Sequence, residues 1–176
     1  MSTKKIKRDN KWIILTTISA FLISGILSVI SELIVPNGFF IINIILVLLF
    51  IIIGIIFDII GVAITTGANS SFHSMSSKKI KGSEIAVNFI NNKDKVSSFC
   101  NDVIGDICGV LSGSGALAIA IKLSADYTLN LMLITVILTA LITALTIGGK
   151  AIGKTIAVNK SNEITFKVAK ILSKFK

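Results

Sequence analysis

The sequence predicts an all-α, polytopic membrane protein with four transmembrane helices, cytoplasmic amphipathic helices, and both termini in the cytoplasm. Three observations support this prediction. Of the 176 residues, 53% are hydrophobic and only 15% are charged, whereas a soluble domain carries about 25% charged residues. Four apolar stretches reach the length of roughly 20 residues that a bilayer requires. The basic residues fall almost entirely in alternate connecting segments.

The apolar stretches define the predicted elements in chain order. The first follows a basic segment, residues 1–11, and its length and its ending at Pro36 favour a retained helix over a cleaved signal peptide. The second and fourth are nearly free of charge, whereas acidic residues and glycines interrupt the third. The predicted spans are residues 12–35, 39–66, 99–121 and 129–149.

The basic residues predict the orientation of these spans. Of the 18 Lys and Arg residues, 17 lie before the first span, between the second and third, or from the end of the fourth onward. Only Lys122 lies elsewhere. The positive-inside rule places the three basic segments in the cytoplasm, so we expect a multi-pass protein of a bacterial cytoplasmic membrane. The net charge of +9 is explained by topology, and no nucleic-acid partner is expected.

Two cytoplasmic segments are predicted to form amphipathic helices. In the tail, residues 156–176, apolar side chains recur on one helical face and lysines on another, which is typical of a helix on an anionic inner leaflet. Residues 67–98 show a poorer pattern built on Ile85, Phe89 and Ile90, and a solvated charged linker remains an alternative there. The tail pattern consists of Ile164, Val168, Ile171 and Phe175 with Lys167, Lys170 and Lys174.

Polar residues inside the spans point to function. Asp58 lies in the second span, where an ionised carboxylate costs at least about 2.5–3.5 kcal/mol and must face protein or water. Small and polar residues share its helical face, which is therefore the expected packed face. These residues are Gly54, Gly61, Thr65 and Asn69.

The third span repeats this pattern. Asp102 and Asp106 share one stripe with glycines, beside Asn101, and we expect them to face the same interior as Asp58. The glycine spacing permits close approach of another helix and favours a homodimer. The packing glycines are Gly105, Gly109 and Gly113. A weaker stripe in the fourth span consists of Thr135, Thr139, Thr143, Thr146 and Lys150.

Carboxylate, amide and hydroxyl oxygens that converge from packed helices are suited to a hard divalent cation such as Mg²⁺. The alternative is a buried ion-pair network, for example Lys150 with Asp102 or Asp106, that serves assembly only. Nothing indicates an enzyme, because the single histidine, His73, has no Cys or Ser partner in a recognisable arrangement. Cys100 and Cys108 are expected to be buried, unbridged thiols.

Three motifs, in order, resemble the transmembrane domain of the CNNM/CorB/CorC family of magnesium transporters. Residues 67–76, GANSSFHSMS, are similar to the family's G-S-E-T-A-L-F-S-L-S. Residues 92–95, NKDK, with Gly105-Asp106 are similar to N-P-D-R and G-N, and residues 149–155, GKAIGKT, to G-E-I-L-P-K-T. The resemblance covers residues 51–172. It assigns residues 39–176 to a CNNM-like domain behind an additional helix and outer loop at 12–38.

The resemblance implies a small dimeric domain that binds dehydrated Mg²⁺ through oxygens near these motifs. By position it nominates Asn69, Ser70 and Asp106, which join Asp58 and Asp102 in the predicted metal site. The chain departs from the family pattern at several positions: Asn69 and Lys150 replace glutamates, Gly153 replaces a proline, and Asp106 replaces an asparagine. The family's CBS domains do not occur in this sequence, so nucleotide regulation through them is not expected.

Two functions follow. The first is a divergent CNNM/CorB-like protein that binds or transports Mg²⁺ or a related divalent cation. The second is a non-transporting membrane adaptor, or pseudo-transporter, in which Lys150 neutralises the former cation site. The size of the chain also permits a small immunity or toxin-like membrane protein, although no motif supports that function.

Overall fold

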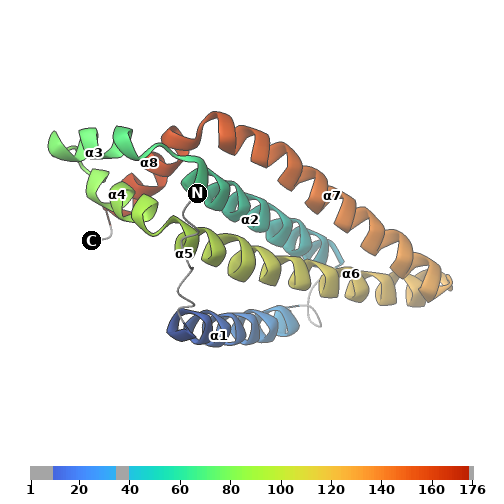
Figure 1. Cartoon of the computed structure of the whole chain (residues 1–176). Helices are drawn as coiled ribbons and strands as arrows, with labels where there is room; N and C mark the ends of the chain where they lie inside the picture. The colour runs from blue at the N-terminus through green and yellow to red at the C-terminus, as the bar shows by residue number, and fades with distance from the viewer. Residues whose placement is uncertain (1–9, 35–39, 175–176) are drawn as a thin grey trace, which may run out of the picture.

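The computed structural model describes residues 10–34 and 40–174. Within these ranges the backbone is helical and forms no strand, which confirms the predicted all-α class (Figure 1). Several predicted features lie outside the described residues, namely Lys4, Lys5, Lys7, Arg8, the loop at Pro36, Phe175 and Lys176. The helices are α1 (Asn10–Ile34), α2 (Phe40–Thr66), α3 (Asn69–Ser77), α4 (Ser83–Asn91), α5 (Lys93–Ser98), the π-helical η1 (Phe99–Gly105), α6 (Asp106–Tyr127), α7 (Leu131–Asn159) and α8 (Ser161–Leu172).

Four helices are long and apolar enough to cross a membrane, as the sequence predicts. The third begins earlier and ends later than predicted, because α5, η1 and α6 run on as one rod over Lys93–Tyr127 (Figure 1). Helix α7 likewise continues past residue 149 to Asn159. Hydropathy detects only the apolar part of such helices, so their polar end turns were not included in the predicted spans. Asn130 caps α7 by accepting hydrogen bonds from two backbone N–H groups of its first turn.

Helices α2, α6 and α7 pack along one another as a three-helix bundle (Figure 1). One part of its core joins all three helices, because aliphatic side chains from α2 meet small and aliphatic residues of α6 and α7. Between helices that lie in a bilayer, close van der Waals packing of such side chains favours association, because lipid is as apolar as the side chains themselves. The fully buried members are Val47, Ile51, Ala116, Ile119 and Ile142.

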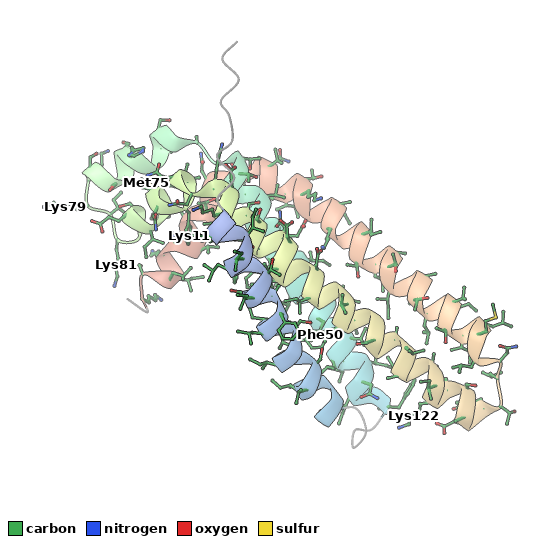
Figure 2. All side chains as sticks on the ribbon, turned by 60° about the horizontal axis from the view of Figure 1, so that its bottom comes forward. Lys11, Phe50, Met75, Lys79, Lys81 and Lys122 are labelled. Carbon is green, nitrogen blue, oxygen red and sulfur yellow. The ribbon has the colours of Figure 1, made fainter. Side chains whose placement is uncertain are left out.

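Helix α1 lies alongside the bundle (Figures 1 and 2). Its main contacts are with η1 and α6. Three of its residues, Ala20, Ile23 and Leu27, pack against a second cluster of buried side chains. This cluster consists of Phe50 of α2, Val103 of η1, and Ile107, Cys108 and Leu111 of α6. Most of its other apolar side chains are exposed, and Phe21 reaches 78%. This exposed apolar surface is compatible with a helix that contacts lipid on its outer side.

Helices α3, α4 and α8 form a small cap at one end of the bundle (Figure 1). Phe72, Ala86, Ile90 and Ala169 make its buried core. The predicted single helical segment over residues 67–98 is therefore divided into α3, α4 and α5. It breaks before α4 because the backbone takes positive φ angles at Lys79 (53°) and Gly82 (92°), which a helix cannot accommodate.

The tail helix α8 packs on α2 and α4 through a face that the sequence did not indicate. Thr165 and Ala169 are buried, whereas Ile164 and Val168 are half-buried and Ile171 is exposed. Small side chains on this face allow α8 to approach α2 and α4 closely. The predicted apolar face thus remains available to a membrane surface, and contact with an inner leaflet stays a prediction.

Two polar contacts belong to the beginning of α8. The Asn162 side chain accepts a hydrogen bond from the backbone N–H of Ala68 (2.8 Å), which ties the helix to the end of α2. Lys167 lies 2.7 Å from Glu163 on the surface. Its hydrogen bond and charge lower the pKa of the Glu163 carboxyl. The first contact holds the start of α8 against the end of α2, whereas the second is an exposed pair within α8.

The labelled lysines separate along the bundle axis. Lys11, Lys79 and Lys81 lie toward the end that carries the cap, and Lys122 lies toward the opposite end (Figure 2). This is the spatial counterpart of the distribution along the chain on which the positive-inside prediction rests. The side on which the termini lie remains a prediction.

Replacement of Gly82 by alanine is expected to destabilise the cap by about 1–3 kcal/mol, because L-residues are strained at positive φ and the new Cβ is crowded. That Cβ lies 3.0 Å from the backbone Cα of Lys170, which cannot move independently of α8. Hydrogen–deuterium exchange should show faster exchange in α4 and α8. The control is Gly148→Ala, whose Cβ meets nothing within 4 Å. Unchanged exchange in the Gly82 variant contradicts the strain argument.

Candidate cation site

Asp58 is the buried carboxylate of the bundle. It belongs to the face of α2 on which Gly54 and Gly61 are also buried, which confirms the predicted packed face over these three residues. One carboxylate oxygen, Oδ1, lies 4.0 Å from the ammonium nitrogen of Lys150 on α7. The other, Oδ2, is buried without a hydrogen-bond partner. The carboxylate is therefore compensated by charge on one side only.

The ion pair between Asp58 and Lys150 corrects the sequence-based expectation that Lys150 pairs with Asp102 or Asp106. Lys150 reaches Asp58 because α7 packs closely on α2 through Gly149 and Gly153. A Cβ on Gly153 would lie 2.7 Å from Cγ1 of Ile59, so the close approach depends on glycine. These two glycines belong to the third motif, but their packing role was not recognised from the sequence.

The contact between the two charged groups has no hydrogen bond. A distance of 4.0 Å exceeds hydrogen-bonding range. The Lys150 side chain is 23% exposed, whereas that of Asp58 is 7% exposed. A long lysine side chain can move its ammonium toward water while its methylene groups remain against apolar neighbours. Lys150 is thus the partner that can reach water, and Asp58 is the more deeply buried partner.

Asn101 supplies a second unpartnered oxygen, which lies against Gly61, one helical turn along α2 from Asp58. Its Nδ2 donates a hydrogen bond to Ser97 Oγ (3.3 Å), whereas its buried Oδ1 has no partner. The side chain occupies the space that Gly61 leaves open, since a Cβ there would lie 2.8 Å from Asn101 Cγ. Gly61 lies one helical turn from Asp58 on the same face. The sequence placed Asn101 beside the acidic stripe but did not nominate it.

The π-helical segment η1 brings Asn101 to α2. Such short π-helical segments occur frequently at functional sites. Gly105, the last residue of η1, is buried between Lys150 and α2: its absent Cβ would lie 3.5 Å from Lys150 Nζ. On the facing helix, a Cβ on Gly54 would lie 3.2 Å from Cys108 Cβ. Missing side chains on both helices therefore give the polar groups room.

Three of the other predicted site residues are not brought to Asp58. Exposed side chains are found at Ser70, Asp102 and Asp106. Asn69 is the first residue of α3, and its side chain is not among those that the structure describes. The expectation that Asp102 and Asp106 face the same interior is wrong for the single chain, because α6 packs on α2 with a different face. That packed face comprises Gly105, Cys108, Leu111, Ser112 and Gly115.

The remaining predicted packing residues lie on the open side of α6. A Cβ on Gly109 or Gly113 meets nothing within 4 Å, so neither glycine is required for a contact within the chain. Both line a shallow groove of about 210 Å³ with threonines of α7. Thr139 and Thr146 donate their hydroxyl protons to carbonyls of their own helix, as Ser and Thr hydroxyls in helices often do.

The cluster at Asp58 combines one negative charge with acceptor oxygens. Across residues 10–34 and 40–174, no group of three or more His, Cys, Asp or Glu side chains gathers closely enough to hold a metal. Asp58 Oδ2 and Asn101 Oδ1 can only accept, so they suit a cation or a hydrogen-bond donor. The two cysteines are buried and free, as predicted, and His73 is exposed. No protein-family model, curated protein or solved structure matches the chain.

Proposed function

We propose that this protein binds and transports Mg²⁺ or a related divalent cation at Asp58 and Asn101, and that the Lys150 ammonium competes for the same carboxylate. The observation that supports this is the pair of buried oxygens without partners, Asp58 Oδ2 and Asn101 Oδ1, on facing helices. Leaving such groups unpaired costs about 1–3 kcal/mol each. Ionisable residues inside membrane spans commonly mark ion pathways.

The donor set suits a partly hydrated divalent ion. Mg²⁺ usually keeps several water molecules and needs only one or two carboxylates from the protein. Asp58 and Asn101 then supply two oxygen ligands, and water supplies the rest. The resemblance to the CNNM/CorB/CorC family supports the same cargo. That further ligands are supplied by Asn69, Ser70, Asp102 and Asp106 remains a prediction. The exposed positions of the last three in the single chain do not favour it.

Lys150 gives the site a built-in counter-ion. With the ammonium near Asp58, the buried charges cancel; with a divalent ion bound, the ammonium adds repulsion and is expected to move toward water, for which its partial exposure leaves room. The cation and Lys150 therefore exclude each other. This exchange keeps Asp58 from being left uncompensated at any stage, which avoids the large penalty of an unpaired buried charge.

Lys150→Met tests the competition. Methionine keeps an unbranched chain but removes the charge, so Asp58 loses its partner and the free protein should be less stable by about 3–5 kcal/mol. Mg²⁺ should then bind at least about tenfold more tightly than in wild type, a difference of about 1.4 kcal/mol. Thermal unfolding in maltoside detergent over a Mg²⁺ series measures both effects. Absence of any Mg²⁺-dependent shift in wild type and variant overturns the proposal.

A non-transporting adaptor is the second candidate, and the existing pair between Asp58 and Lys150 favours it. In an adaptor the pair is permanent and serves assembly. Lys150→Met then lowers stability and no concentration of Mg²⁺ restores it, whereas the double variant Asp58→Asn/Lys150→Met recovers most of the loss, because removing both charges leaves none unpaired. Mg²⁺ flux into proteoliposomes, measured with an enclosed indicator, separates the two candidates directly.

A further inference from the structure

A surface site with both polar and apolar lining lies on another side of η1, between this segment and α1. It is a groove of about 370 Å³, within the range of pockets that take small organic ligands. Asn101 faces α2, whereas the next residue, Asp102, lines this groove. Opposite Asp102, α1 contributes Trp12, Thr16 and Thr17. The groove is therefore distinct from the cluster around Asp58.

Three side chains of the groove, those of Thr16, Thr17 and Asp102, can accept hydrogen bonds or positive charge, and Ser98 and the Trp12 indole N–H also line it. Thr16 Oγ1 donates its proton to the backbone carbonyl of Trp12 (2.9 Å), and Thr17 Oγ1 donates to that of Ile13 (2.9 Å). With the protons committed to their own helix, these hydroxyls offer lone pairs only. Asp102 is acceptor-only when ionised, and no hydrogen bond or ion pair joins it to another residue in the described part of the chain. A positively charged ligand meets these requirements.

The indole of Trp12 adds a surface for a cation. The Lys95 ammonium lies 5.2 Å from the centroid of this ring, within cation–π range. The ring face thus already accepts an ammonium group in this structure. Ligand ammonium groups, including quaternary ones, are recognised by aromatic side chains in the same way.

The remaining lining distinguishes an organic cation from a metal ion. Ile13, Ala20 and Val103 present hydrocarbon to the groove, and a strongly hydrated inorganic ion gains nothing from such surface. An ammonium ion that carries an aryl or alkyl group uses both kinds of lining. We propose that the groove between α1 and η1 binds an organic ammonium ion with an apolar substituent. This proposal does not depend on cation binding at Asp58.

Trp12 makes a direct test available, because it is the only tryptophan of the chain. Titration of the full-length protein in maltoside detergent with benzyltrimethylammonium chloride should change Trp12 fluorescence saturably. Sodium chloride at equal ionic strength and neutral benzyl alcohol should not reproduce the change. Asp102→Asn should weaken binding at least about tenfold, because it removes the countercharge at nearly constant shape.

Asp106→Asn is the matched control, since Asp106 is an equally exposed carboxylate one turn along the same rod that does not line the groove. It should bind benzyltrimethylammonium as wild type does. Thr17→Val, which removes one acceptor at constant shape, should weaken binding several-fold and gives a second reading if Asp102→Asn fails to fold. Equal binding by wild type, Asp102→Asn and Thr17→Val overturns the proposal. Saturation by Mg²⁺ at lower concentration than the ammonium ion also overturns it.

Discussion

Asp58→Asn is expected to abolish Mg²⁺-dependent stabilisation and Mg²⁺ flux, with an apparent affinity reduced at least about 100-fold, equivalent to about 2.8 kcal/mol. Asparagine has nearly the size of aspartate but lacks the negative charge of Asp58, which is the one acidic residue buried in the described part of the chain. It also leaves Lys150 without its counter-ion, so the ammonium is expected to move to water. Isothermal titration and proteoliposome flux give the two measurements.

Asp106→Asn provides the comparison for this result. It removes the same charge from a neighbouring helix at an exposed position. We expect it to retain Mg²⁺ binding to within a few-fold. If Asp106→Asn abolishes binding while Asp58→Asn preserves it, the cation site lies on the outer face of α6 and the assignment to Asp58 is wrong.

Gly61→Ala is expected to lower the free energy of unfolding by about 1–3 kcal/mol, the usual cost of overpacking a filled core, and to weaken Mg²⁺ binding together with it. The added methyl group would lie 2.8 Å from Asn101 Cγ and closer still to Oδ1, so the amide must leave its place beside Asp58. The variant therefore removes a ligand without changing any ligand residue. Thermal unfolding with and without Mg²⁺ measures both effects.

Gly109→Ala is the matched control for Gly61→Ala. Both replace a glycine inside a long helix, but a Cβ at Gly109 has no neighbour within 4 Å. Alanine has the higher helix propensity by about 1 kcal/mol, so this variant should be neutral or slightly more stable. Equal destabilisation by the two changes indicates that stability depends on the flexibility of the glycines. The contact between the Asn101 side chain and Gly61 would then not determine it.

Much of the fold follows from the pattern of residues along the chain. Four apolar stretches of sufficient length predict the four long helices, and the helical spacing of Gly54, Asp58 and Gly61 predicts the face of α2 that is buried. For α2 this works because Gly54, Asp58 and Gly61, its two glycines and its aspartate, all lie on one side. A single face is then available for packing.

For α6 the pattern is ambiguous. Asp102 and Asp106 share one stripe with glycines, while Asn101, Gly105 and Cys108 form another polar and small face beside it. Spacing shows which residues share a face, but the neighbouring helix selects the face. Here α2 packs against the second face, which carries Asn101, Gly105 and Cys108. The outcome depends on contacts between distant segments, above all the seat of Asn101 on Gly61.

The partner of Lys150 could not be predicted for the same reason. The pattern shows a lysine at the end of an apolar stretch and three acidic residues in other spans. Which acid it meets depends on how close α7 comes to α2, and that distance depends on the absence of side chains at Gly149 and Gly153. The sequence contains these glycines, but their contacts with Ile55 and Ile59 exist only in the folded chain.

Because Phe99–Gly105 is π-helical, the site depends on how many residues this segment contains as well as on which residues they are. A π-helical stretch behaves as an α-helix with an inserted residue, and each residue of an α-helix adds about 100° of rotation. A single-residue deletion in this stretch therefore rotates Asn101 away from Gly61 while α6 keeps its contacts with α2. The same rotation also carries α5 and the cap with it. Insertions and deletions here would alter cation binding although every ligand remained in the chain.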